Sequence, residues 1–194
     1  MSVTSAKTGS TSLSLALENN FMEPIASTLV GAGGSNTIEF ADIPQGYKHL
    51  QIRGIAKTTR SGAYNYASDF TINFNSDYSS NYSAHGIYSF SSIYGFGIPD
   101  YNTIIFQSAS ADGDGVIPNI FGASVIDILD YSNKNKFKTT KSLTGTITTA
   151  DYTDMLAFNS GNWRSFNPVE NIQIKAGSFN FKQHTRFSLY GIKG

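Results

Sequence analysis

Asp69-Phe-Thr-Ile-Asn-Phe-Asn75 is the stretch that decides the fold class of this 194-residue chain. Apolar and polar residues alternate along it, so Phe70, Ile72 and Phe74 share one side of an extended backbone. A period of two predicts a β-strand with one buried face, as is usual in an antiparallel sheet. The stretch therefore predicts a protein that contains an antiparallel β-sheet.

Turn residues separate further segments of the same kind. Strands are expected over residues 11–17, 25–30, 36–40, 47–57, 69–75, 103–107, 120–131, 136–148, 154–158, 169–176 and 185–192, with one or two short strands in long loops over 78–101. The glycines between 25–30 and 36–40 predict that these two strands form a hairpin. No stretch carries a convincing helical period over three turns, so about ten strands predict an all-β antiparallel sandwich or barrel.

The N-terminal part of the chain differs in composition from the rest. Leu13, Leu15 and Leu17 alternate there with small residues, which predicts a short strand in an otherwise extended segment. The length of the chain favours one domain. We therefore expect an N-terminal arm over residues 1–22 and a single β-sandwich domain over residues 23–194.

The composition excludes several classes of protein. Lys and Arg number 14 and so do Asp and Glu, so the net charge is zero, which argues against a nucleic-acid partner. The absence of Cys excludes disulfides and thiol chemistry. No apolar run is long enough to span a membrane, and residues 1–20 do not resemble a secretory leader. An aromatic content of 13% argues against disorder.

The neutral total hides an uneven distribution of charge. Between Arg60 and Lys134 there is no Lys or Arg, and the seven acidic residues there are all Asp. A basic segment follows at once, and its lysines are Lys134, Lys136, Lys138 and Lys141. One interpretation is an edge strand that its lysines protect from foreign pairing. The other is a basic face that meets an acidic partner surface.

Motifs for catalysis are missing from the sequence. Its three histidines are His49, His85 and His184, and no Ser lies in a G-x-S-x-G context. Neither a phosphate-binding P-loop nor an H-E-x-x-H metal motif occurs. A pair of Asp side chains brought together by the fold remains open. We expect a protein that is not an enzyme and that needs no cofactor.

Two acidic clusters carry oxygen ligands suited to Ca²⁺. Asn73–Asp77 has them at alternate positions, and Asp112–Asp114 has two carboxylates around a glycine. Neither cluster has the full EF-hand pattern, and Asx-Gly turns are common without metal. The preferred interpretation is that Asn75, Ser76 and Asp77 cap a turn, with Ca²⁺ as the alternative.

Aromatic residues gather in the uncharged segment 78–101. Tyr88, Tyr94 and Phe96 are the candidates there for a recognition surface, either for a protein or for stacked sugar rings. The alternative is that these rings pack under their own loop. Trp163 follows a predicted strand, and we interpret it as a core or loop anchor.

Several phrases, taken in their order and spacing, resemble one protein family. They are Phe21-Met-Glu-Pro-Ile-Ala26, Ile43-Pro-Gln-Gly-Tyr-Lys-His-Leu-Gln-Ile-Arg53, Ile72-Asn-Phe-Asn-Ser-Asp77 with Ser80-Asn-Tyr82, Ile126-Asp-Ile-Leu-Asp-Tyr131 with Asn133-Lys-Asn-Lys136, Ser160-Gly-Asn-Trp163, and Phe187-Ser-Leu-Tyr-Gly-Ile-Lys-Gly194. The family comprises virion structural proteins of tailed bacteriophages, common among phages of cyanobacteria. The resemblance runs from about residue 13 to the last residue.

The resemblance implies a jelly-roll-like β-sandwich and a structural role without catalytic residues. Members resemble capsid decoration (cement) proteins or tail proteins. The resemblance thus implies a protein made in the host bacterial cytoplasm and placed on the outer capsid surface of the virion. Its expected partners are the major capsid protein and copies of itself, as a trimer by preference or as a dimer.

The expected contacts with these partners involve two segments. On the arm they are Leu13, Leu15, Leu17, Phe21 and Met22, and on the basic segment Lys134, Lys136, Lys138 and Lys141. The arm is expected to add a strand to a neighbour's sheet. The alternative function is a tail or fibre module that binds host polysaccharide through the aromatic stretch.

Overall fold

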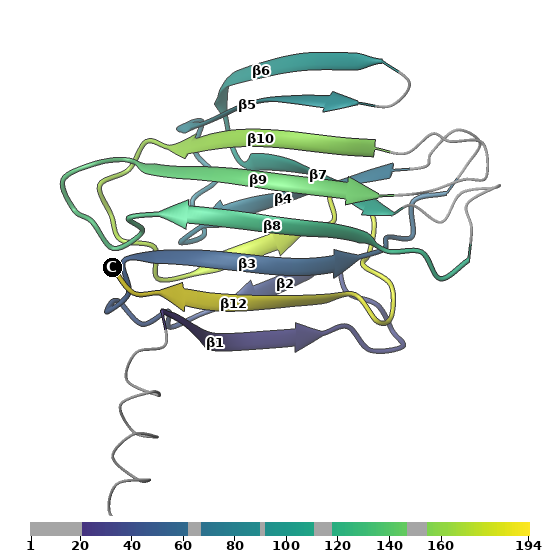
Figure 1. Ribbon diagram of the computed structural model, residues 1–194, viewed down its shortest axis with the longest axis horizontal. Helices are drawn as coiled ribbons and strands as arrows, with labels where there is room; N and C mark the ends of the chain where they lie inside the picture. The colour runs from purple at the N-terminus through teal and green to yellow at the C-terminus, as the bar shows by residue number, and fades with distance from the viewer. Residues whose placement is uncertain (1–20, 62–66, 90–91, 111–117, 147–154) are drawn as a thin grey trace, which may run out of the picture.

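A computed structural model describes residues 21–61, 67–89, 92–110, 118–146 and 155–194, and these residues form twelve β-strands and no helix (Figure 1). The strands are β1 (Met22–Leu29), β2 (Thr37–Phe40), β3 (His49–Ala56), β4 (Ala67–Phe74), β5 (Tyr82–Ser89), β6 (Ile93–Tyr101), β7 (Ile104–Ser110), β8 (Gly122–Leu129), β9 (Lys138–Thr146), β10 (Met155–Trp163), β11 (Ile172–Lys175) and β12 (Arg186–Ile192). In this part of the chain no helix is long and apolar enough to cross a membrane.

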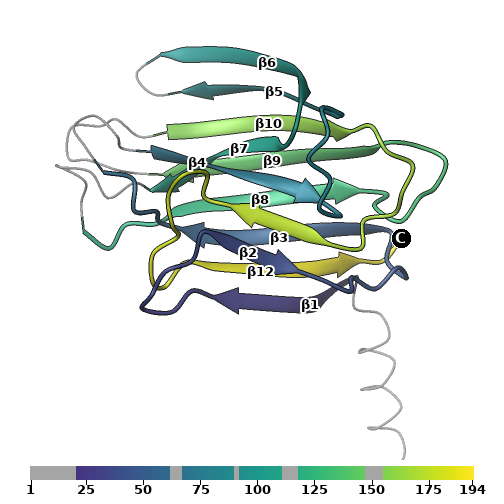
Figure 2. The same cartoon turned by 180° about the vertical axis from the view of Figure 1, so that it is seen from behind.

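The strands form two antiparallel sheets that lie face to face. The large sheet has the order β1-β12-β3-β8-β9-β10-β5-β6, and the small sheet has the order β2-β11-β4-β7. Figure 1 shows the large sheet in front, and Figure 2 shows the small sheet from the other side. The predicted antiparallel β-sandwich is therefore confirmed.

The strand order identifies the sandwich as a jelly roll. The strands β1-β12-β3-β8 of the large sheet face the strands β2-β11-β4-β7 of the small sheet. Along the chain, β1, β2, β3 and β4 lie alternately in the large and the small sheet, and β7, β8, β11 and β12 alternate between the sheets in the same way. Eight strands in two sheets of four, wound in this way, make a jelly roll. Two inserted hairpins, β5–β6 and β9–β10, widen the large sheet on the side of β8. We call these four strands the extension.

Two local expectations were wrong. The strands over 25–30 and 36–40 do not form a hairpin, because β1 pairs with β12 and β2 pairs with β11. The turn that Gly34 makes at φ 69° carries the chain from one sheet to the other. Residues 78–101 are not long loops either, since β5 and β6 form a hairpin with eight and nine residues in its strands.

The core lies between the sheets and is rich in aromatic side chains. Phe70, Ile72 and Phe74 are fully buried, so the face predicted from residues 69–75 is confirmed. The ring of Phe70 packs edge-on against Phe181 and Phe187 at centroid distances of 6.4 and 5.4 Å. Such edge-to-face pairs stabilise a core beyond the burial of their area.

A second aromatic cluster lies where the extension joins the jelly roll. Trp163 is 1% exposed and stacks on Tyr82 at 6.1 Å, with Phe74 at 5.5 Å. Its place in the core agrees with its interpretation as an anchor. The cluster ties β4, β5 and β10 together across the two sheets, which fixes the position of the extension.

Candidate protein-binding face

The strands β9 and β10 place their large apolar residues on the outside of the sandwich. In β9, Leu143 is 52% exposed, whereas the hydroxyl side chains of alternate residues face inward and are buried. In β10, Leu156 and Phe158 are 58% and 52% exposed, whereas the alternate residues Ala157 and Asn159 are buried. This is the reverse of the ordinary arrangement, because a sheet normally buries its apolar face.

The strand register places these side chains beside others of the same kind. Val125, Leu143, Phe158 and Ile87 are direct neighbours across β8, β9, β10 and β5. Neighbouring strands lie about 4.8 Å apart, so the four side chains form a continuous row on the outer side of the large sheet. The outer side of the large sheet faces the viewer in Figure 1.

A second row runs beside the first. It follows Ile55, Ala123, Gly145, Leu156, Ser89 and Ile93 through the same register. The large residues of both rows, which we call the apolar face, are 40% to 78% exposed: Ile55, Ile87, Ile93, Val125, Leu143, Leu156 and Phe158. Contiguous exposed apolar surface of this kind marks interaction sites.

Positive charge borders the apolar face on the side of the jelly roll. Arg53 lies opposite Val125, and Arg186 lies opposite Ile55. Neither guanidinium pairs with a carboxylate in the part of the chain that the structure describes. The Arg53 guanidinium instead donates a hydrogen bond to the side chain of Gln51 at 2.9 Å and lies over the Tyr190 ring at 5.7 Å. A partner with carboxylates beside an apolar surface would complement this border.

The other end of the apolar face is slightly hollow. A shallow depression of about 300 Å³ opens between β10, β5 and β6, with Ile87, Gly95 and Phe158 in its wall. Its lining is mostly apolar, with the side chains of His85 and Ser160 as its polar groups. The depression can receive an apolar side chain of a partner, which extends the apolar face into a small socket.

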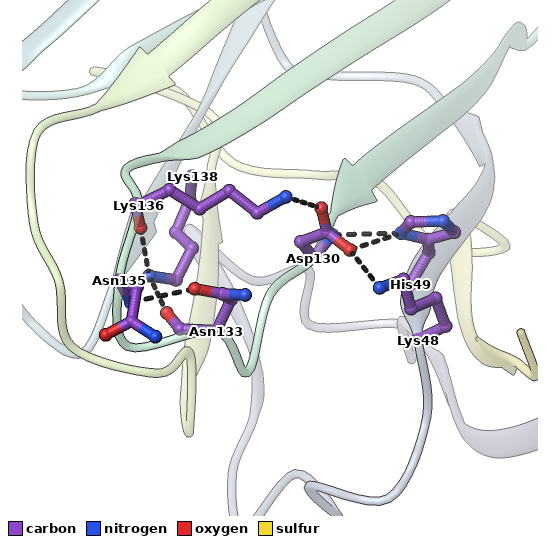
Figure 3. A network of polar contacts seen from close by, with 7 residues as sticks. All are labelled: Lys48, His49, Asp130, Asn133, Asn135, Lys136 and Lys138. Carbon is purple, nitrogen blue, oxygen red and sulfur yellow. Dashed lines mark hydrogen bonds and ion pairs between the residues drawn. The ribbon is translucent and has the colours of Figure 1, made fainter.

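The predicted basic segment is largely neutralised by the aspartates that precede it (Figure 3). Lys136 pairs with Asp130, which also pairs with Lys48 at 3.1 Å. These two ammonium groups lower the pKa of the Asp130 carboxyl, and Lys136 has the larger effect. Lys141 pairs with Asp127 across β9 and β8 at 3.4 Å. The pairing of β8 with β9 thus brings the acidic and the basic side chains of the sequence next to each other.

Lys138 differs most from what the sequence led us to expect. Its side chain is fully buried, and its Nζ donates to the carbonyl oxygens of Asn133, Lys136 and Ser165 at 2.7, 3.1 and 3.3 Å. Figure 3 shows it turned into its own loop. Burial lowers the pKa of this ammonium. In this arrangement Lys138 braces the loop and presents no charge to a partner, whereas Lys134 is exposed.

Of the five residues predicted for the arm contact, Leu13, Leu15 and Leu17 lie outside the described residues. Phe21 is 69% exposed, and its carbonyl accepts the backbone N–H of Lys193 at 3.0 Å. Met22 begins β1 opposite Ile192, so it belongs to the edge of the large sheet.

The first acidic cluster is occupied by internal hydrogen bonds. Asp77 accepts the backbone N–H of Ser79 at 2.9 Å, the amide of Asn81 at 2.8 Å and the indole N–H of Trp163 at 2.8 Å. Burial raises the pKa of Asp77, but these donors outweigh it and lower the pKa to about 2. The described residues contain no group of three His, Asp or Glu side chains placed to hold a metal. This geometry supports the turn-capping interpretation; Asp112–Asp114 lies outside the described residues.

The aromatic candidates come together on the opposite side of the extension from the apolar face. Tyr88 stacks on Tyr94 at 5.4 Å and lies 6.3 Å from Phe96. The register pairs Tyr88 with Tyr94 directly. The rings therefore cover one another, which agrees with packing within their own hairpin more than with an open platform for sugars.

The residues of the apolar face were not among those singled out from the sequence. Strands were predicted over 136–148 and 154–158, and their alternation was the available signal. Alternation by itself assigns the apolar side of a strand to the interior, which is the wrong side for β9 and β10. Only the packing of β7 against β9 and β10 assigns the polar side to the interior.

No known family model and no curated protein sequence matches the chain. Among solved structures, a fructofuranosidase variant from Schwanniomyces occidentalis is 10% identical with a TM-score of 0.19 and covers 83% of this chain and 34% of its own. Alginate lyase A1-II' is 8% identical with a TM-score of 0.16, covering 81% and 66%. A botulinum neurotoxin type C structure is 10% identical with a TM-score of 0.14, covering 89% and 43%. This chain thus spans a third to two thirds of their lengths, and scores this low support neither a fold family nor an activity.

Proposed function

We propose that the chain is a non-enzymatic structural protein of a phage virion, a capsid decoration (cement) protein that binds the outer surface of an assembled capsid. The observation that carries the proposal is the apolar face, because the register aligns seven large apolar side chains on a side that the described residues leave uncovered. The resemblance to phage virion proteins suggests the capsid shell as the partner. The protein is then made in the host cytoplasm and located on the outer capsid surface.

The proposed contact combines apolar burial with charge. Covering the apolar face removes surface worth about 25 cal/mol per Å², of which association consumes a large part. The exposed Arg53 and Arg186 add a preference for a shell surface that carries carboxylates beside its apolar area. The basic contribution that was expected from residues 134–141 moves, in this proposal, to these two arginines.

The proposal is tested with phage particles assembled without this protein. The double variant Leu143→Ser, Phe158→Ser should keep the fold, since both side chains are about half exposed, and should lose at least tenfold in affinity for the particles. Occupancy is measured by co-sedimentation and gel densitometry. The matched control is Phe166→Ser, which replaces a 55% exposed phenylalanine in the loop after β10 and should bind as the parent chain does.

The remaining outcomes are equally clear. Equal binding by the double variant and the parent chain contradicts the role of the apolar face. Hundreds of copies in each purified virion support decoration, whereas a few copies favour a tail component. Glycan binding that disappears in the Tyr88→Ala, Tyr94→Ala variant would replace the proposal with the polysaccharide-binding alternative.

A further inference from the structure

The outer edge of β6 is the least protected backbone edge of the sandwich. β6 ends the large sheet and pairs only with β5, so its other side offers backbone donors and acceptors to which no described strand is paired. Residues 93–98 carry no charge and no proline, and four of the six are exposed. Proteins usually protect such edges with charges, prolines or bulges, because an open edge pairs with other chains.

The other three sheet edges are protected or short. β1 contains Pro24 and a break in register between Pro24 and Ala26. β2 has only four residues, and β7 packs against β9 and β10 of the large sheet. On β6, the proline and the aspartate come only at its end, at Pro99 and Asp100. The edge over residues 93–98 is therefore the position at which a strand can be added.

We propose that residues 11–17 of a second copy of this chain add to the edge of β6 and extend the large sheet by one strand. The segment is seven residues long, uncharged and free of proline, and its leucines alternate with small residues. Six or seven residues match the length of the open edge. The main-chain hydrogen bonds provide affinity, and the alternate side chains provide specificity.

The two sides of β6 suit the two sides of the arm. Tyr94, Phe96 and Ile98 alternate on the inner side of β6, where Tyr88 already stacks on Tyr94. Leu13, Leu15 and Leu17 would lie beside this row and cover Tyr94, which is 47% exposed. The small arm residues would then face Gly95 and Gly97 on the outer side of β6, where an added strand meets no side chain of its neighbour.

The geometry requires a second copy. The arm joins the body at β1, and β6 lies at the opposite edge of the large sheet, seven strand spacings away (Figure 1). Seven spacings of about 4.8 Å amount to about 34 Å. The five residues from Leu17 to Met22 span at most about 18 Å. An arm therefore cannot reach its own β6. Head-to-tail pairing between copies forms a closed ring where the rotation between them closes, and the proposed trimer is such a ring.

Disulfide trapping in the full chain tests the pairing, because the parent sequence contains no Cys. One chain carries Gly97→Cys, where an added Cβ meets nothing within 4 Å, and a second chain of different size carries Ser12→Cys, Ser14→Cys or Ala16→Cys. Oxidation of the mixture should link the two chains for at least one of the three arm positions. Leu13→Cys, on the other side of the arm, should not link. Absence of a link with all three arm variants contradicts the proposal.

Sedimentation of the uncross-linked chains is the second measurement. Gly97→Lys should raise the dissociation constant of self-association at least tenfold, and so should removal of residues 1–17. The matched control Ala26→Lys places the same charge on the edge strand β1 and should stay within twofold of the parent chain. A monomeric parent chain, or assembly that persists in Gly97→Lys, overturns the proposal. Assembly that survives without the arm but fails in Gly97→Lys also overturns it, since two β6 strands would then pair with each other.

The strand exchange describes how copies of the chain associate and rests on the proposed function as a capsid protein. Experiments can contradict either proposal without contradicting the other. The Leu143→Ser, Phe158→Ser variant should assemble normally and lose the capsid. Gly97→Lys should stop assembling and still bind the capsid through the apolar face, with lower avidity. Normal assembly without any capsid binding by the parent chain would overturn the decoration role and leave the strand exchange intact.

Discussion

The Asp77 carboxylate joins three parts of the chain. It accepts hydrogen bonds from the turn at Ser79, from Asn81 just before β5, and from Trp163 at the end of β10. Hydrogen bonds to an ionised acceptor are about twice as strong as neutral ones. A single side chain thus couples the inserted hairpin β5–β6 to the second inserted hairpin β9–β10, so its ionisation state contributes to the position of the extension.

Replacement of Asp77 by Asn should make the stability less dependent on acid. The folded-state pKa of about 2 lies below the ordinary value of 3.8, so the ionised form stabilises the fold above about pH 4, and this stabilisation is lost as the pH falls toward 2. Asp77→Asn should lower the free energy of unfolding by about 1–2 kcal/mol at pH 7 and by much less near pH 2. Urea unfolding at several pH values measures this, and a constant difference between the proteins would contradict it.

At the scale of the element, β9 buries a stripe of hydroxyl groups. Thr140, Ser142 and Thr146 face the interior, and their oxygens have no hydrogen-bond partner among the described residues. Burial of an unpaired hydroxyl costs free energy. The neighbouring strands β8 and β10 set the register of β9, and the exposed Leu143 on its outer side agrees with the proposed contact with a partner.

Removal of one of these hydroxyls should stabilise the protein. Thr140→Val replaces the side chain by one of similar shape without the polar group, so the free energy of unfolding should rise by about 1 kcal/mol. The exposed neighbour Thr139 serves as the control, and Thr139→Val should change stability by less than about 0.5 kcal/mol. Denaturant unfolding of the two variants gives both values. A loss of stability in Thr140→Val would mean that its hydroxyl binds an internal water.

At the scale of the whole molecule, the jelly roll and the extension have different roles. The jelly roll contains the main aromatic core, whereas the extension carries most of the apolar face and ends in the open edge of β6. The proposed contacts use two separate surfaces, one on a sheet face and one on a sheet edge. A single copy can therefore bind the capsid and its neighbours at the same time, which favours a cooperative layer of many copies.

Removal of residues 1–20 should leave the fold intact, because all twelve described strands lie between Met22 and Ile192. The truncated chain should unfold in one cooperative transition whose midpoint does not depend on protein concentration. The midpoint of the full chain should rise with concentration, since association stabilises the folded state by mass action. Thermal unfolding followed by circular dichroism compares them, and loss of the cooperative transition on truncation would show that the arm belongs to the core.

The sequence by itself determined the class of fold and part of the core. Period-two alternation over residues 69–75 predicts which side of β4 is buried, because Phe70, Ile72 and Phe74 leave only one apolar side. The turn-forming residues separated most strands correctly. The turn at Asn75–Asp77 and the anchoring role of Trp163 also follow from local chemistry, since short polar side chains bond to nearby backbone and a lone tryptophan seeks burial.

Only the tertiary structure decided which residues meet. Strands β1 and β2 pair with strands more than a hundred residues away, which no turn signal between them encodes. The pairing of Lys136 and Lys141 with Asp130 and Asp127 depends on the register of β8 and β9. The apolar face depends on it as well, because alternation would turn the apolar side of β9 and β10 inward, whereas long-range packing turns their polar side inward and leaves Leu143 and Phe158 exposed.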